Sequence, residues 1–497
     1  MDCNSDKKNV YNDSEIQFDQ QQQQQNEPRV LIAKVDNVSA EEEKILDQPM
    51  SEIATDQIEK DQDFVEMDPQ TKSEQEQQEE QQQLETYQLY AYDFKDNEKT
   101  CQLLGSTGTR YNTTVKETLE QEKSIFQQKV NPSHVYDGNN HFRNAKWSPD
   151  GCCLLSNSSD NAIRLFNLPY ELLDQQTELS EPIDLTTNFG VREGEAIYDF
   201  AWFPSMTSQV RDHPVHLWDA CTGDLRASYS IIDHRERFIG PNVLSFNLDG
   251  SRIYCGYENM IEIFDVQRPG QASQKIPTIP QKRTKEGQKG IISCLDFSPD
   301  YAGLYAAGSY SHNVGIYDET TNDLCLKLTG IKTGVTQVKF SNDGSQLFTV
   351  CRVSNVISCW DIRNTTDVLY DLPRPGQTSQ RIAFDIDPSG KVLTTGDQSG
   401  NVLFYDINSG ASENRVLKTI HAHQDLSVCA TINPMYPWLI ASASGQRKYT
   451  IDEDNSSDDD DEDNDKDVLP IDNSLKVWRI PGHTKWFSYP TAATVEN

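Results

Sequence analysis

Residues 294–318, CLDFSPDYAGLYAAGSYSHNVGIYD, form the unit that decides the fold. Leu295 and Phe297 alternate with smaller or polar residues, and a Ser-Pro-Asp turn follows them. Two further short apolar runs come next, at 304–308 and 314–317, and an aspartate closes the second. This pattern predicts three strands joined by turns. Because a meander of three strands cannot bury both faces alone, we expect the unit to recur along the chain.

The unit recurs at the spacing of a propeller blade. Aligned on the residue before the first turn, the copies are WSPDG at Trp147, WFPS at Trp202, FNLDG at Phe246, FSPD at Phe297, FSNDG at Phe340, FDIDPSG at Phe384 and a looser INPMYP at Ile432. Successive copies lie 55, 44, 51, 43, 44 and 48 residues apart, the period expected for four-stranded blades. The third strand of each copy ends similarly, as LFN at 165, LWDA at 217, IFD at 263, IYD at 316, CWDI at 359, FYDI at 404 and VWRI at 477. We therefore predict an all-β fold, a seven-bladed WD-repeat β-propeller over residues 134–480.

Two acidic segments carry most of the charge. The formal net charge is −34, of which residues 1–85 contribute −16 and residues 452–467 contribute −10. The repeat region is therefore only mildly acidic. Its overall charge does not exclude an RNA partner, provided that basic residues gather on one face.

The regions before the repeats differ in composition. Residues 1–83 are rich in glutamine and acidic residues and poor in aromatics, so we expect a disordered acidic tail, either an interaction tail or a solvated one. Residues 84–133 should hold a closing strand at 86–94, TYQLYAYDF, that pairs into the last blade, and a connector with a short helix around VKETLEQEKSIF. Residues 481–497 form a C-terminal tail.

Two blades depart from the pattern. In blade two, Trp202 and Trp218 lie 16 positions apart and a clear apolar second strand is lacking, so the blade is either truncated or rebuilt from the preceding loop at 170–193. In the last blade the acidic run 452–467 should form an extruded loop between the second and third strands. That loop would deter nonspecific nucleic acid or bind a basic partner.

The eleven cysteines show no metal-binding spacing, which favours buried free thiols in a reducing compartment. Neither a signal peptide nor an apolar window of membrane-spanning length is evident, so we expect no membrane partner.

No catalytic motif is present, and we expect a protein that is not an enzyme and has no cofactor. His421 and His423 form an H-x-H pair, which without a third ligand is better read as structural than as a metal site. An aspartate follows the third strand in five blades, a position typical of turn residues rather than of catalytic acids: Asp219, Asp265, Asp318, Asp361 and Asp406.

Several stretches together resemble the telomerase Cajal body protein family over residues 140–480. They are HFRNAKWSPDGCCLLSNSSDNAIRLFNLP at 141, GEAIYDFAWFPSM at 194, HPVHLWDACTGDLRASY at 213, GIISCLDFSPD at 290, QRIAFDIDPSG at 380 and ASASGQR at 441. The resemblance implies a nuclear, partly cytoplasmic adaptor that binds the CAB box of small Cajal-body RNAs of the box H/ACA and C/D classes, and telomerase RNA where present. It implies localisation of these particles to Cajal bodies, with dyskerin, coilin and a cytosolic chaperonin as partners.

The loops between second and third strands, and those entering each first strand, should ring one mouth of the propeller. Arginine forks and tyrosine rings there suit a single-stranded RNA loop, although any single arginine could instead pair with an aspartate of a neighbouring blade. The candidate RNA-binding residues are Arg143, Tyr198, Arg211, Tyr257, Tyr310, Arg352, Gln380, Arg381, Gln446 and Arg447.

A basic loop at 275–289, KIPTIPQKRTKEGQK, is either a second contact to phosphates, a nuclear-entry signal, or a solvated loop. Its candidate phosphate-contact residues are Lys282, Arg283, Lys285 and Lys289. The competing function for the whole chain is a propeller scaffold that binds only proteins, such as an RNP-assembly or ubiquitin-ligase adaptor.

Overall fold

The unit that recurs in the sequence forms three antiparallel strands of one sheet. In the computed structural model, β16 (Ile292–Phe297), β17 (Leu304–Ser309) and β18 (Asn313–Asp318) pair in order, and β19 (Leu324–Leu328) adds the outer strand. The residues described are 29–34, 86–95, 100–111, 114–123, 125, 138–193, 196–204, 215–220, 224–232, 239–280, 286–408, 415–447 and 471–488.

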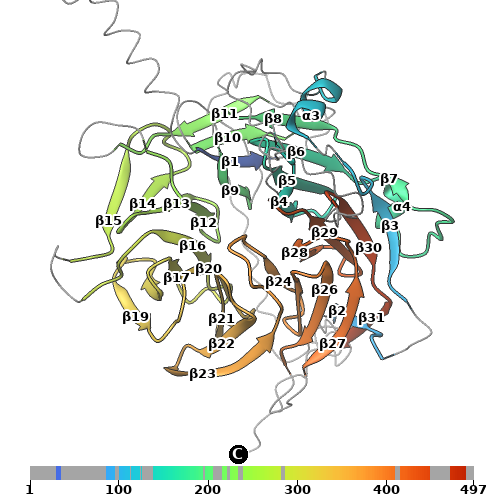
Figure 1. The fold of residues 1–497 in the computed structure, drawn as a ribbon. Helices are drawn as coiled ribbons and strands as arrows, with labels where there is room; N and C mark the ends of the chain where they lie inside the picture. Colours follow the sequence, from blue (N-terminus) through green and yellow to red (C-terminus); the bar gives the residue numbers. More distant parts are fainter. Residues whose placement is uncertain are drawn as a thin grey trace, which may run out of the picture. The chain divides into compact units, whose positions relative to one another are not determined.

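Further sheets of this kind surround the same centre (Figure 1). Three follow the regular antiparallel order: β12 (Val243–Phe246), β13 (Arg252–Tyr257), β14 (Met260–Asp265) and β15 (Ser273–Pro277); β20 (Val335–Phe340), β21 (Gln346–Cys351), β22 (Val356–Asp361) and β23 (Asn364–Pro373); β24 (Phe384–Ile386), β25 (Val392–Gly396), β26 (Asn401–Asp406) and β27 (Val416–His421). Blade one contains β4 (Phe142–Trp147), β5 (Cys153–Ser158), β6 (Ala162–Asn167) and β8 (Phe189–Arg192).

The last blade closes with a strand other than the one predicted. It contains β28 (Ser427–Ile432), β29 (Leu439–Ser444), β30 (Leu475–Arg479), β3 (Gln102–Ser106) and β7 (Ile183–Asp184). The closing strand is thus β3, which pairs antiparallel with β30 and places fully buried Leu104 in the core. The predicted closing strand instead forms β2 (Thr86–Tyr92), which pairs with β31 (Gly482–Ser488) of the expected C-terminal tail in a separate two-stranded sheet.

Blade two is incomplete in the repeat region. It has β9 (Ile197–Trp202), β10 (Val215–Asp219) and β11 (Leu225–Tyr229), and β1 (Arg29–Lys34) lies between β9 and β10. The sheet is therefore rebuilt from the N-terminal region and not from the loop at 170–193. We expected residues 1–83 to be disordered, but Arg29–Lys34 form a strand. The other residues of this tail lie outside those described.

The all-β WD-repeat propeller class is confirmed, but in the described residues six and not the predicted seven blades are complete without β1. Six sheets draw all their strands from Gln102 onward, whereas blade two needs β1 for its fourth strand. In the part of the chain that the structure describes, two short helices accompany the sheets: α3 (Val115–Gln121), in the predicted connector, and α4 (Tyr170–Leu173). No helix in the described ranges is long and apolar enough to cross a membrane. The described residues fall into two units: 29–34 belong with Tyr92–Pro481 to the first, and 86–91 with 482–488 to the second.

A buried ionic cluster attaches α3 to blade one. Arg164, 1% exposed, donates from Nε to Glu122 Oε2 at 2.8 Å, and Glu122 caps the C-terminus of α3. Its Nη2 lies 2.5 Å from Asp160 Oδ2, and Arg192 reaches the same carboxylate at 3.1 Å. The two arginines hold the pKa of Asp160 well below its usual range. The cluster is therefore charged at neutral pH.

The turn aspartates behave as predicted in four of the five blades. The side chains of Asp265, Asp318, Asp361 and Asp406 accept backbone N–H bonds from residues two positions further on. The fifth, Asp219, is buried and pairs with Arg226. The acidic run 452–467 lies outside the described residues, but it follows β29 and precedes β30, which pair with each other as predicted.

Candidate functional site

A cavity of about 690 Å³ lies among the inner strands β4 and β9 and the loops that follow β5, β17, β21 and β29. Arg143 and Tyr198 reach it from the strands, and the other candidates reach it from loops. Eight of the ten predicted residues line this one cavity: Arg143, Tyr198, Tyr310, Arg352, Gln380, Arg381, Gln446 and Arg447. The blade register read from the sequence therefore brought together residues separated by up to 304 positions.

Two of the predicted residues are not placed in the cavity. Arg211 lies outside the described residues. Tyr257 is described, but it does not line the cavity, and its hydroxyl donates to Glu262 of the same sheet. Tyr257 is the last residue of β13, and its side chain contacts its own blade instead of lining the cavity.

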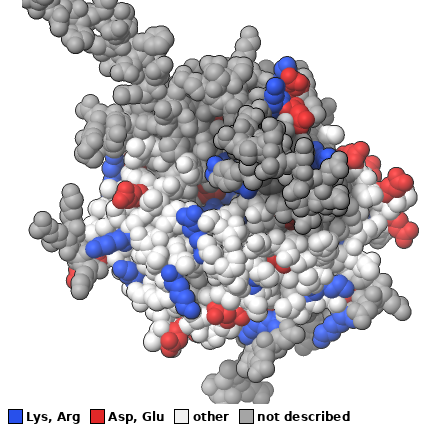
Figure 2. All heavy atoms as spheres, viewed as in Figure 1, with Lys and Arg blue, Asp and Glu red and all other residues white. Residues whose placement is uncertain are grey.

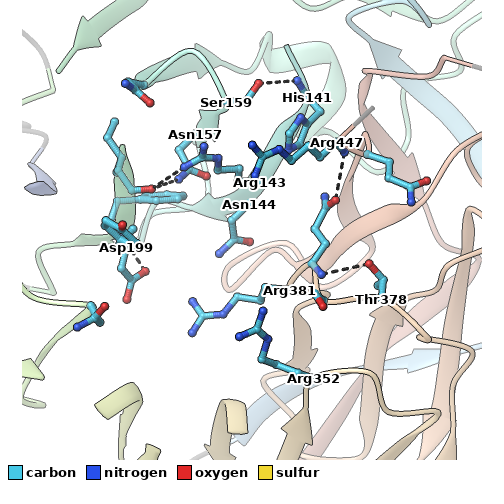
Figure 3. Close-up of a pocket in the computed structure, with 18 of the residues that line it drawn as sticks. His141, Arg143, Asn144, Asn157, Ser159, Asp199, Arg352, Thr378, Arg381 and Arg447 are labelled. Atoms are coloured by element: carbon cyan, nitrogen blue, oxygen red, sulfur yellow. Dashed lines mark hydrogen bonds between the residues drawn. The ribbon is translucent and has the colours of Figure 1, made fainter. Parts of the chain in front are cut away.

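The cavity is rich in arginine and poor in acid. Arg143, Arg352, Arg381 and Arg447 line it, and Asp199 is the one carboxylate among its described lining residues. Figure 3 shows Arg143 and Arg447 approaching from one side and Arg352 and Arg381 from the other. Asp199 is already engaged, since it accepts from Lys146 Nζ at 3.1 Å. The cavity therefore has an excess of positive charge.

Two of the arginines are held by backbone oxygens. Arg381 Nη2 donates to Ser293 O at 2.7 Å and to Thr336 O at 2.5 Å, which ties together the first strands of two blades. Arg143 Nη1 donates to Ile197 O at 3.4 Å, and burial lowers the pKa of its guanidinium. Carbonyl oxygens satisfy donors without neutralising charge, so both arginines keep their full positive charge for a ligand.

Arg352 and Tyr310 form the most accessible pair. The Arg352 guanidinium carbon lies 5.4 Å from the centre of the Tyr310 ring, a cation–π contact between loops of adjacent blades. Arg352 is exposed and the Tyr310 side chain is 37% exposed. A base or a phosphate could therefore reach this pair with little rearrangement. Tyr198, 52% exposed, offers a second aromatic face.

Gln380 holds part of the cavity wall in place. Its Nε2 donates to Gly445 O at 2.8 Å, and its Oε1 accepts from Arg447 N at 3.5 Å. Gln446 O accepts in turn from Asn139 Nδ2 at 2.9 Å. These bonds join the loops of three blades, so the amide residues serve mainly to position the arginines.

Sequence reasoning missed a polar set in blade one. Asn157 is 3% exposed, and its Oδ1 has no hydrogen-bond partner among the described residues. His141 is also buried, and burial together with Arg143 and Arg447 lowers its pKa to about 4, so it is neutral at pH 7. A signal existed for Asn157, because it is a polar residue at a strand position where alternation predicts an apolar one. The remaining lining residues missed are Asn139, Asn144, Ser159, Asn161, Ile197, Asp199, Phe200, Asn242, Thr378 and Ser379.

A second cavity, of about 530 Å³, differs in its charge balance. It is lined by Lys146 and Lys339 with Asp296, Asp385 and Asp387. Lys339 Nζ lies 2.5 Å from Asp385 Oδ1, and Lys146 pairs with Asp199. Because carboxylates neutralise its lysines, this cavity should bind an anionic ligand much more weakly than the first cavity. Figure 2 shows basic and acidic side chains interspersed on the face of the molecule that it presents.

The predicted phosphate-contact loop is mostly outside the described residues. Lys282, Arg283 and Lys285 fall in the segment 281–285, which is not described, whereas Lys289 is described and exposed. Lys275, at the start of the loop, donates to Ile232 O at 2.9 Å.

His423 is structural, as predicted. It is buried, its Nε2 lies 2.8 Å from Ser442 Oγ, and Trp478 Nε1 donates to the same hydroxyl at 3.0 Å. Its Nδ1 lies 3.6 Å from Asp472 Oδ2. This chain of contacts fastens the last blade. Within the described ranges, no group of three or more His, Cys, Asp or Glu side chains is arranged to hold a metal ion.

Comparison with known proteins agrees with this architecture. The family model of the WD domain, G-beta repeat, matches residues 130–167 and 280–318. Telomerase Cajal body protein 1 of Mus musculus is 36% identical over 323 residues, 62% of this chain and 60% of that protein. The Homo sapiens protein of that name is 36% identical over 325 residues, 62% of this chain and 58% of that protein. Guanine nucleotide-binding protein negative regulator 1 of Schizosaccharomyces pombe is 29% identical, over 64% of this chain and 83% of that protein. The chain thus spans about three fifths of the length of the mammalian relatives.

Proposed function

From a WD-repeat propeller that is similar in sequence to telomerase Cajal body proteins, we propose an RNA-binding adaptor that makes and breaks no covalent bond. Its ligands are small Cajal-body RNAs, recognised through the CAB box, and telomerase RNA where the organism has a suitable one. The adaptor brings these particles to Cajal bodies in the nucleus, with a cytoplasmic fraction.

The observation that carries the proposal is the charge of the first cavity. Four arginines line it against one engaged carboxylate, and two accessible tyrosines lie beside them. Guanidinium groups bind phosphate oxygens in a bidentate manner, and aromatic rings stack on unpaired bases. A cavity of this size and composition suits a few nucleotides of a single-stranded loop better than a duplex, whose bases are not splayed out.

The partners follow from this function. RNP core proteins such as dyskerin would arrive with the RNA, coilin would hold the complex in the Cajal body, and a cytosolic chaperonin would assist folding of the propeller. Of the candidate phosphate contacts, Lys289 is described and exposed, so its ammonium group is free to reach solvent and ligand.

A protein-binding scaffold is the second candidate. The name of the Schizosaccharomyces pombe relative refers to regulation of a guanine nucleotide-binding protein and mentions no RNA. On this alternative the arginine-lined cavity would receive acidic side chains of a protein, and RNA would be carried by partners of the scaffold.

Direct binding of RNA by the purified chain distinguishes the two candidates. Arg352→Ala should weaken binding of a CAB-box RNA by roughly ten- to a hundredfold, the loss of one charge-assisted contact of about 1.5 to 3 kcal/mol. Arg268→Ala is the matched control, because Arg268 is 80% exposed and does not line the cavity. Equal binding of CAB-box and scrambled RNA, with Arg352→Ala identical to the parent protein, would favour the scaffold.

A further inference from the structure

In blade two, the described residues of the repeat region supply no strand between β9 and β10. We call this strand position the slot. Among the described residues, β1 is the only strand that pairs with β9, and it lies between β9 and β10. Ile197 and Phe200 of β9 are 1% exposed, and Val215 and Leu217 of β10 are equally buried. Buried backbone N–H and C=O groups need partners. Without β1, the facing edges of β9 and β10 would have none in this sheet.

The segment Arg29–Lys34 suits this slot by its sequence. It reads RVLIAK, four apolar residues between two basic ones, the pattern of a strand buried on both faces. Its Cα register runs from Val30 opposite Val215 to Lys34 opposite Asp219. It runs parallel to both neighbours, although a second strand made by the blade itself would run antiparallel to them. The stretch 205–214, SMTSQVRDHP, which would otherwise supply that strand, has no comparable apolar run.

The strand beside the slot also builds the cavity. Ile197 O accepts from Arg143 Nη1 and from Asn157 Nδ2, both at 3.4 Å. Asp199 accepts from Lys146 of blade one and, at 3.3 Å, from Leu244 N of the following blade. Through these bonds, β9 connects its two neighbouring blades and anchors an arginine of the cavity.

We propose that Arg29–Lys34 is an intramolecular complementing strand that completes blade two and keeps β9 in the position that the cavity requires. The N-terminal region is then a structural part of the binding site, although it is 163 residues distant from β9 in sequence. The segment acts by β-strand addition, in which main-chain hydrogen bonds supply affinity and the apolar run selects the slot.

Hydrogen exchange of the full-length protein tests this proposal. Leu31→Asp introduces a charged residue at the strand position whose Cα pairs with that of buried Phe200, so exchange at β9 and β10 should become roughly tenfold faster or more, while β20 and β21 remain protected. Val38→Asp is the matched control: it adds the same charge to the same region four residues beyond the strand, and it should have no effect.

A peptide of residues 26–37, NEPRVLIAKVDN, added to the Leu31→Asp protein should restore protection of β9 and β10, whereas a scrambled peptide should not. If Leu31→Asp fails to fold, the milder Leu31→Ala gives the same readout. Unchanged exchange at β9 and β10 in the variants, or equal effects of Leu31→Asp and Val38→Asp, would overturn the proposal. If the parent protein protected β9 and β10 only at concentrations at which it dimerises, the strand would come from a second copy. That result would overturn the claim that the complementation is intramolecular. These readouts do not involve RNA, so they stand apart from the proposed function.

Discussion

At the scale of single residues, the cavity combines strongly basic groups with a histidine that stays neutral. His141 is buried beside Arg143 and Arg447, and its pKa falls to about 4 from an ordinary 6.5. A lowered pKa means that the unfolded chain binds more protons than the folded one between these values. Stability contributed by neutral His141 is therefore present above about pH 6.5 and is lost as the pH falls toward 4.

His141→Gln should remove part of that pH dependence. The parent protein should lose up to about 3 kcal/mol of unfolding free energy through this group between pH 6.5 and 4, because each pKa unit corresponds to about 1.4 kcal/mol. Urea unfolding across this range provides the measurement. His421→Gln is the control, since His421 is exposed and its Nδ1 lies 3.1 Å from Asn401 Oδ1. Parallel pH curves for the parent and the His141 variant would show that the group does not contribute.

At the scale of elements, closure of the last blade depends on β3. Leu104 is fully buried in the same core as Val477 of β30. Leu104→Ala should lower the free energy of unfolding by about 2 to 5 kcal/mol, because it leaves a cavity where the chain closes on itself. Chemical denaturation measures the loss, and Leu326→Ala, at a leucine that is 37% exposed, should cost much less. Comparable losses in both variants would contradict this role of β3.

The ionic cluster at α3 gives a second prediction for elements. Asp160→Asn keeps the shape but leaves Arg164 and Arg192 buried with one carboxylate fewer, so it should cost about 3 to 5 kcal/mol. Asp361→Asn is a matched control, since its partner Arg363 is 76% exposed and such surface pairs contribute about 0 to 1 kcal/mol. Thermal unfolding should separate the two variants clearly. A small effect of Asp160→Asn would mean that the cluster relaxes or takes up water.

At the scale of the whole molecule, the acidic run at 452–467 has a charge opposite in sign to that of the arginine-lined cavity. Residues 452–467 carry a net charge of −10 between two strands of the last blade. Replacing them by a neutral linker of equal length should increase the affinity for scrambled RNA more than for CAB-box RNA, because long-range repulsion acts on any polyanion. The effect should diminish as salt rises from 50 to 200 mM, which a titration by fluorescence anisotropy would measure. A scrambled segment of the same composition should behave as the parent does.

Much of the fold and of the site was predictable because it depends on local patterns. The blade period, the turn aspartates and the structural role of His423 follow from strand alternation and turn chemistry within about 45 residues. The same register assigned Arg352 and Arg381 to one mouth. His141 was not predicted, because burial beside Arg143 and Arg447, and not residue type, makes it part of the site. Asn157 was missed although its polar type at an expected apolar strand position marked it.

The sequence by itself therefore determined the propeller class and the gathering of loop residues at one mouth, since each blade repeats the same pattern of strands and turns. Only the tertiary structure decided which N-terminal segments enter the sheets. TYQLYAYDF and RVLIAK both read as strands, but the alternation of a strand does not state which edge it will pair with. The first pairs with β31, and the second fills blade two, while the less conspicuous QLLGS closes the last blade. The main-chain hydrogen bonds of a strand can form with any unpaired strand edge that is buried to a similar degree. Which edge a given segment pairs with therefore depends on which edges the rest of the fold leaves unpaired.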